Sequence, residues 1–313
     1  MCARSDGRML TNQSRPPIAA FLVLATMAFL ATSCSADNPT APGTIKLVAA
    51  ENFYGALARE IGGSHVDVTS ILSNPDADPH LFQPGTSTGQ EVAVANVVVM
   101  NGLGYDDWMN RLMEAAPSKG RIVVSVADVV HQAGVDPNPH LWYDALQMPQ
   151  VVDAIASALE RVDPSHAAAY KSGAQQARAS IASIANAVLK LRKDFGGADV
   201  AYTERVPGLL LSDAGMNVLT PPSFARSIED GTDPAPADIA AMQELLTSHR
   251  VKVLLYNNQA TSPITDQLQG LARAEGIPVV PVSETLPRGQ TFAFWQLHQI
   301  ASLRAALKSS LPR

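Results

Sequence analysis

The stretch SHAAAYKSGAQQARASIASIANAVLKLRKDF, residues 165–195, decides the fold of this chain. This segment carries apolar side chains in unbroken steps of four and three, at Tyr170, Ala174, Ala177, Ile181, Ile184, Val188 and Leu191. The spacing predicts one apolar stripe on a continuous helix of about 30 residues, or roughly 45 Å at 1.5 Å per residue. Pro164-Ser165 is typical of a helix start, and Gly196-Gly197 ends the pattern.

Short apolar runs alternate with helical patterns on both sides of this stretch. Before it, we expect strands at 45–50, 66–72, 97–101 and 121–126, and helices near 53–61, 87–95 and 106–115. After it, we expect strands at 199–203, 217–219, 251–256 and 278–282, and helices near 207–215, 236–248, 261–275 and 292–309. Apolar runs separated by helices are typical of buried parallel sheets.

The predicted fold class is therefore α/β, with two lobes that contain parallel sheets and are joined by a single long helix. The lobes are expected at 44–164 and 196–313, and the linking helix at 165–195. A coiled coil is the alternative use of such a helix, but turns this rich in alanine make a weak zipper. The length of 313 residues also suits about two domains.

Charge and cysteine content narrow the possible ligands. The net charge of −6 argues against nucleic acid as a partner, because nucleic acid needs a basic face. The two cysteines, Cys2 and Cys34, both lie in the first tenth of the chain. Any metal site beyond Cys34 must therefore use His, Asp or Glu rather than thiolates.

The N-terminus has the pattern of a targeting segment. Three arginines precede an apolar run of about 14 residues at 18–31, which is short for a membrane span and typical of a signal sequence. The following Leu30-Ala31-Thr32-Ser33-Cys34 resembles a bacterial lipobox. We predict a signal peptide at 1–33, a lipid on Cys34 and a tether over 34–43 that anchors the protein to the outer face of a membrane. The alternative is an ordinary cleaved signal peptide that happens to contain a cysteine.

Two histidines occur in matching contexts. His80 lies in Asp78-Pro79-His80-Leu81-Phe82, and His140 lies in Asn138-Pro139-His140-Leu141-Trp142. Each motif follows a predicted strand, where open α/β sheets bind their ligands. Proline limits the freedom of each loop, and the aromatic residue two positions later is expected to pack beneath the imidazole. The repeated context favours metal ligation over two unrelated solvated rings.

The second lobe offers carboxylates at the ends of its own strands. Glu204 follows the strand expected at 199–203, and Glu284 follows the strand expected at 278–282. Taken alone, each of these carboxylates is more typical of a helix N-cap or a solvated loop. Their candidacy as ligands depends on the rest of the pattern.

The whole mature chain resembles the zinc- and manganese-binding solute-binding proteins of bacterial ABC importers. The resemblance rests on the two histidine motifs, on Tyr202-Thr203-Glu204 and Val282-Ser283-Glu284-Thr285, and on their order around the long helix. That family takes one ligand from each of these places, in a cleft between the lobes. The resemblance implies that His80, His140, Glu204 and Glu284 bind the metal. The fourth position is most often Asp in the family, and Glu284 is one methylene longer.

The resemblance also implies a function. The protein is expected to be a monomeric, extracytoplasmic binding protein, anchored to the cell membrane by lipid. It would capture Mn²⁺ or Zn²⁺ and deliver it to the membrane permease of an ABC importer, without catalysis. Carboxylates suit manganese and imidazoles suit zinc, so both metals stay open. Protons compete for the histidines, so affinity is expected to fall below about pH 6.

Two other function classes remain as alternatives. An exported metallohydrolase would hold its zinc with three protein ligands and an open position, and the sequence contains no H-E-x-x-H or G-x-S-x-G pattern. A binding protein for a metal chelate such as a siderophore would need an aromatic-lined cleft, and only 5% of the residues are aromatic. Metal analysis of the purified protein separates the three.

Overall fold

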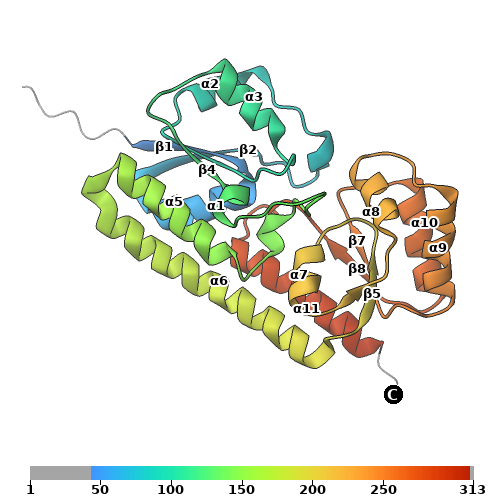
Figure 1. The fold of residues 1–313 in the computed structure, drawn as a ribbon. Coiled ribbons are helices and arrows are strands. Elements are labelled where there is room, and N and C mark those ends of the chain that lie inside the picture. Colours follow the sequence, from blue (N-terminus) through green and yellow to red (C-terminus); the bar gives the residue numbers. More distant parts are fainter. Residues whose placement is uncertain (1–43, 311–313) are drawn as a thin grey trace, which may run out of the picture. The chain divides into compact units, whose positions relative to one another are not determined.

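Residues 44–310 are described by the computed structural model (Figure 1). The predicted signal peptide at 1–33, the lipid site at Cys34 and the tether at 34–43 lie outside the described residues. None of the helices within 44–310 is both long and apolar enough to cross a membrane.

The first sheet consists of four parallel strands in the order β2-β1-β3-β4. The strands are β1 (Ile45–Glu51), β2 (Val66–Leu72), β3 (Val97–Met100) and β4 (Ile122–Ser125). Helices of this half are α1 (Asn52–Gly62), α2 (Thr86–Ala93), α3 (Asp107–Ala115), α4 (Val126–Val129) and α5 (Met148–Val162). Each predicted strand and helix of this half is present within one or two residues of its expected ends, but α4 and α5 were not predicted.

The second sheet repeats this arrangement, with parallel strands in the order β6-β5-β7-β8. Its strands are β5 (Asp199–Tyr202), β6 (Asn217–Val218), β7 (Leu254–Asn257) and β8 (Val279–Val282). The helices are α7 (Gly208–Asp213), α8 (Pro222–Glu229), α9 (Pro236–Thr247), α10 (Pro263–Ala274) and α11 (Phe292–Ser309). The strand expected from 251 begins three residues later, at Leu254, and α8 was not predicted.

The long helix α6 (Ala167–Phe195) is continuous, as its stripe predicts, and a 3-10 turn at Pro164–His166 precedes it. All seven residues of the stripe are buried. They pack against α1 and α5 of the first half and against α11 of the second. One hydrophobic core runs through α6 and includes residues of both sheets. The two-lobed α/β fold with a single long helix is thereby confirmed.

Close approach between α6 and α1 depends on one glycine. Gly173 lies on the buried face of α6, and a Cβ atom there would stand 2.2 Å from the backbone oxygen of Ile61 at the end of α1. No side chain moves out of the way of such a contact, because the obstructing atom belongs to the backbone. Gly173 directly precedes Ala174 of the stripe, and this close contact explains why a glycine stands there.

Gly173→Ala is expected to destabilise the protein by about 1–3 kcal/mol, since α6 must shift away from α1. Chemical denaturation monitored by circular dichroism measures this change. The matched control is Gly270→Ala in α10, where an added Cβ meets no atom within 4 Å. That variant should gain roughly 0.4–1 kcal/mol from reduced chain entropy. Equal stabilities for the two variants would contradict this account of the helix contact.

Candidate metal centre

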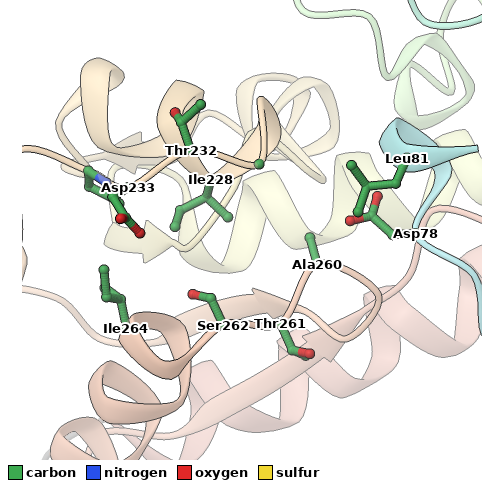
Figure 2. Close-up of a pocket in the computed structure, with 11 residues that line it drawn as sticks. Asp78, Leu81, Ile228, Thr232, Asp233, Ala260, Thr261, Ser262 and Ile264 are labelled. Carbon is green, nitrogen blue, oxygen red and sulfur yellow. The ribbon is translucent and has the colours of Figure 1, made fainter.

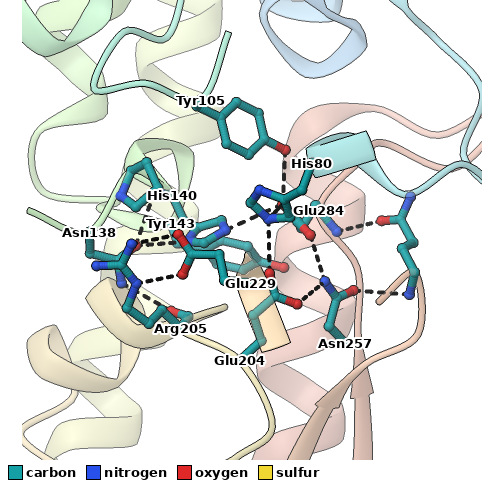
Figure 3. A network of polar contacts seen from close by, with 12 residues as sticks. His80, Tyr105, Asn138, His140, Tyr143, Glu204, Arg205, Glu229, Asn257 and Glu284 are labelled. Atoms are coloured by element: carbon teal, nitrogen blue, oxygen red, sulfur yellow. Dashed lines mark hydrogen bonds and ion pairs between the residues drawn. The ribbon is translucent and has the colours of Figure 1, made fainter. Parts of the chain in front are cut away.

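Four side chains from four separate segments lie together: His80, His140, Glu204 and Glu284. One ligand atom from each lies within 4.8 Å of those from the other three. His80 Nε2 is 2.9 Å from Glu204 Oε1 and 3.4 Å from Glu284 Oε2, and His140 Nε2 is 3.3 Å from Glu284 Oε2 (Figure 3). The structure therefore brings together all four of the residues that the family resemblance implies as ligands.

These separations suit a small metal ion. Ligands at about 2.1 Å from a tetrahedral metal stand about 3.4 Å from one another. The set offers two imidazole nitrogens and two carboxylate oxygens, which are ligands that both zinc and manganese accept. The cluster is also deeply placed, because the side chains of His140, Glu204 and Glu284 are fully buried while that of His80 is 16% exposed. Solvent thus reaches the four residues on the His80 side.

His80 is held by its own loop and by Tyr105. The histidine sits in the 3-10 turn Pro79–Leu81, where the carboxylate of Asp78 accepts a hydrogen bond from the His80 backbone at 2.9 Å. Its ring packs edge-on against Tyr105, with 5.5 Å between centroids. The expectation that Phe82 packs beneath His80 is wrong, because the Phe82 ring lies against Trp108 instead. Tyr105 takes that place and comes from a loop before α3.

His140 is oriented by the asparagine two residues before it. Asn138 Nδ2 donates to the backbone oxygen of Arg205 at 3.0 Å, so Asn138 Oδ1 is the atom that faces the imidazole. His140 Nδ1 therefore donates to Asn138 Oδ1 at 2.7 Å, which leaves Nε2 as the ring atom available to a metal. This buried Nε2 has no hydrogen-bond partner within the described structure, as suits a ligand atom. Trp142 packs edge-on to the ring, as its position two residues later predicts.

The two glutamates follow the carboxyl ends of β5 and β8, and both are held by neighbours that the sequence analysis missed. Asn257 Nδ2 donates to Glu204 Oε2 at 2.7 Å and to Glu284 Oε1 at 2.5 Å. The Tyr105 hydroxyl donates to Glu284 Oε2 at 2.9 Å. Asn257 ends a central strand, so the strand-end argument used for the glutamates would have found it. No sequence pattern around Tyr105 indicates that it contacts the candidate ligands.

Charge in this cluster is balanced by a proton on His80. Burial alone lowers the pKa of His80, but attraction by Glu284 and the hydrogen bond to Glu204 outweigh burial and raise that pKa to about 12. Burial and the charge of Glu284 raise the pKa of Glu204. Burial also raises the pKa of Glu284, but the charges and hydrogen bonds of His80 and His140 together outweigh it and leave that pKa lowered. Without metal, the site is thus an ion-paired cluster.

An ion pair between the two halves borders the site. Arg205, which follows Glu204, forms two hydrogen bonds to the buried carboxylate of Glu229 in α8, each 2.5 Å long. Its Nη1 also donates to Asp136, in the loop before His140, at 2.9 Å. These residues and His80 line a cleft of about 350 Å³. The cleft leads to the only one of the four ligand candidates that is exposed.

A second hollow of about 200 Å³ lies beside the His80 loop (Figure 2). Asp78 and Leu81 line it from the first half, and residues of the α8–α9 and β7–α10 connections line it from the second, among them Asp233 and Ser262. Its lining contains no histidine or cysteine. This hollow therefore lacks the ligand set that distinguishes the His80 cluster.

A family model described as zinc-uptake complex component A, periplasmic, matches residues 47–306. The chain is 29% identical over 180 residues to a putative metal-binding protein of Treponema pallidum, an alignment that covers 50% of this chain and 56% of that protein. It is 29% identical over 163 residues to the manganese-binding lipoprotein MntA of Halalkalibacterium halodurans, with 49% and 52% covered. The chain spans about half the length of these curated relatives.

Solved structures share the fold. The periplasmic zinc-binding protein TroA of Treponema pallidum superposes with a TM-score of 0.74 at 15% identity, covering 85% of this chain and 99% of that one. FpvC of Pseudomonas aeruginosa, in complex with Mn²⁺, superposes with a TM-score of 0.71 at 19% identity, covering 86% and 100%. At these identities the likeness concerns the architecture of two lobes and one long helix.

The proton on His80 predicts how metal binding depends on pH. A metal at Nε2 must displace this proton, and the raised pKa keeps the proton in place well above the range of free imidazole. Apparent affinity should therefore rise about ten-fold per pH unit between about pH 7 and 8.5, and fall correspondingly on acidification. Calorimetric titration in buffers of different protonation enthalpy counts the protons released. Metal uptake without proton release near pH 8 would show that His80 is already neutral.

Proposed function

Because the chain belongs to the family of periplasmic component A of zinc-uptake complexes, we propose that it captures a divalent transition metal, zinc or manganese, and delivers it to the permease of an ABC importer. The convergence of His80, His140, Glu204 and Glu284 is the observation that carries this proposal. The four residues come from both halves of the molecule, so a bound ion would hold the two lobes together. The protein's role would then be capture and transfer, without catalysis.

The chemistry of the four side chains supports metal capture over the two alternatives. A hydrolytic zinc site keeps one coordination position open for water, whereas four protein side chains lie close enough together here to fill a tetrahedral set. A siderophore would need an apolar or aromatic cleft. The cleft beside His80 is lined instead by charged side chains, including Asp136, Arg205 and Glu229. A bare cation suits this environment better than an organic chelate.

We further propose that the protein works outside the cytoplasm on a lipid anchor at Cys34, as a monomer. The family model is described as periplasmic, and the curated relative MntA is a lipoprotein. On this proposal residues 1–33 are removed as a signal peptide, and 34–43 tether the lobes 44–164 and 196–313, which 165–195 links. The lipid would keep the binding protein close to its permease.

Metal titration of histidine variants tests the proposed capture. The unaltered protein should bind about one zinc or manganese ion per chain and become more heat-stable, because the folded site binds and the unfolded chain largely does not. His80→Ala and His140→Ala should each weaken binding beyond the roughly 10–100-fold cost typical of losing an outer-shell partner. The control is His249→Ala, an exposed residue that forms an ion pair with Glu275 and does not belong to the cluster of four candidates. Equal affinities in all three variants would mean that the metal binds elsewhere.

Fractionation of a Cys34→Ser variant tests the anchor. The unaltered protein should partition with membranes and carry diacylglycerol on Cys34. Without that thiol the lipid has no attachment point, so the variant should be released in soluble form or remain as the uncleaved precursor. Mass spectrometry of the mature N-terminus measures both results. Membrane association that is unchanged in Cys34→Ser would contradict lipidation at this residue.

A further inference from the structure

Strand order places one amide side chain between the two candidate carboxylate ligands. In the second sheet β7 lies between β5 and β8. Asn257 is the last residue of β7, and Glu204 and Glu284 each lie two residues beyond the ends of β5 and β8. Since parallel strands end at the same edge of a sheet, Asn257 is flanked by the two glutamates in space (Figure 3).

The orientation of this amide is fixed by its own contacts. Asn257 Oδ1 accepts a hydrogen bond from the backbone of Gln259 at 3.0 Å, so Nδ2 must point toward the carboxylates. From there Nδ2 donates to Glu204 Oε2 and to Glu284 Oε1. An amide nitrogen carries two hydrogens, and both are thereby used. Asn257 is 1% exposed, which leaves little room for water to replace it.

Each carboxylate is left with one oxygen for a metal. Glu204 Oε1 and Glu284 Oε2 are the atoms that face His80, at 2.9 and 3.4 Å. The opposite oxygens are turned toward Asn257. Tyr105 and Gln259 resist a rotation of Glu284 that would present both of its oxygens. The Tyr105 hydroxyl donates to Glu284 Oε2 at 2.9 Å, and Gln259 Oε1 accepts from the Glu284 backbone N–H at 2.6 Å.

We propose that Asn257 determines the metal preference of the site: it holds Glu204 and Glu284 as one-oxygen ligands and thereby favours zinc over manganese. With both carboxylates so held, the site offers two nitrogens and two oxygens, and four donors suit the tetrahedral preference of zinc. Manganese prefers more oxygen donors in octahedral surroundings, which carboxylates supply best when both oxygens bind. The inference rests on the proposed metal capture and adds a positioning residue to it.

Removal of the amide should loosen this restriction. In Asn257→Ala, each glutamate regains a free oxygen and can bind a metal through both. The ratio of zinc to manganese affinity, measured by competition at constant pH, should fall by about ten-fold or more, as for other residues behind metal ligands. Co²⁺ serves as the spectroscopic probe. The unaltered protein should give the intense visible absorption of tetrahedral Co²⁺, and Asn257→Ala the weak absorption of higher coordination.

Two further variants serve as a control and as a milder substitution at the same position. Gln269→Ala removes another buried amide of the same half, whose side-chain hydrogen bonds within residues 44–310 are to Asp266 and from Arg273, and it should leave both the ratio and the spectrum unchanged. Asn257→Ser keeps one hydroxyl donor and fills more of the space, so it should fall between the unaltered protein and Asn257→Ala. If Asn257→Ala does not fold, the affinity ratio and the Co²⁺ spectrum are measured on Asn257→Ser instead.

The outcomes separate this inference from the proposed function. If the unaltered protein binds no zinc, manganese or cobalt, both fail. If it binds them, an unchanged affinity ratio in Asn257→Ala or Asn257→Ser overturns the role of Asn257 alone. A five- or six-coordinate Co²⁺ spectrum from the unaltered protein overturns that role as well, without any variant. A lowered ratio together with loss of the tetrahedral spectrum supports it, provided that Gln269→Ala shows neither.

Discussion

Burial of two carboxylates close to each other is the constraint on which the rest of the site depends. Glu204 and Glu284 are fully buried, and bringing two such charges together is unfavourable unless positive charge or hydrogen-bond donors compensate. The surroundings provide both, since Asn257 donates to the two glutamates and Tyr105 donates to Glu284. The remaining charge is met by a proton on His80, which a divalent cation would replace. The negative charge of the two buried carboxylates thus keeps a proton on His80 when no metal is present, and the same charge attracts a divalent cation.

The scaffold makes this confinement possible at small cost. In both halves the ligand candidates lie beyond the carboxyl ends of parallel strands, so the strands fix their positions while the loops provide the side chains. The helix α6 contributes no ligand, but it packs against helices of both halves through one buried stripe. Gly173 permits the close contact with α1. A rigid connection of this kind lets four side chains from distant parts of the sequence meet without each loop having to be ordered separately.

Sequence patterns predicted the features that have a period or a repeat. The stripe of α6 and the apolar strands follow from spacing alone, and the paired histidine motifs follow from their shared context. The glutamates at 204 and 284 needed the family resemblance, because a carboxylate after a strand has many uses. Tyr105 escaped prediction, since its role arises from loop packing, which no local pattern encodes, whereas Asn257 was missed because the strand-end argument was applied only to carboxylates. The helix α5 was missed although Val151, Ile155 and Leu159 form a stripe, whereas α8 has only eight residues and starts at Pro222.

One further amide ties the ligands of the two halves to each other. Gln259 accepts hydrogen bonds from the backbones of Glu284 and Thr285, and its Nε2 donates to the backbone oxygens of Pro75 and Ala77 in the loop that carries His80. The position of His80 therefore depends on the same side chain that fixes Glu284. His80 is also the partly exposed member of the four, so a metal that enters or leaves passes its loop. Exchanging the two loop hydrogen bonds for water costs only about 0.5–1.5 kcal/mol each. This cost is small beside that of breaking metal–ligand bonds, so with a metal bound the bond from His80 to the metal, and not these two hydrogen bonds, would limit the opening of the His80 loop.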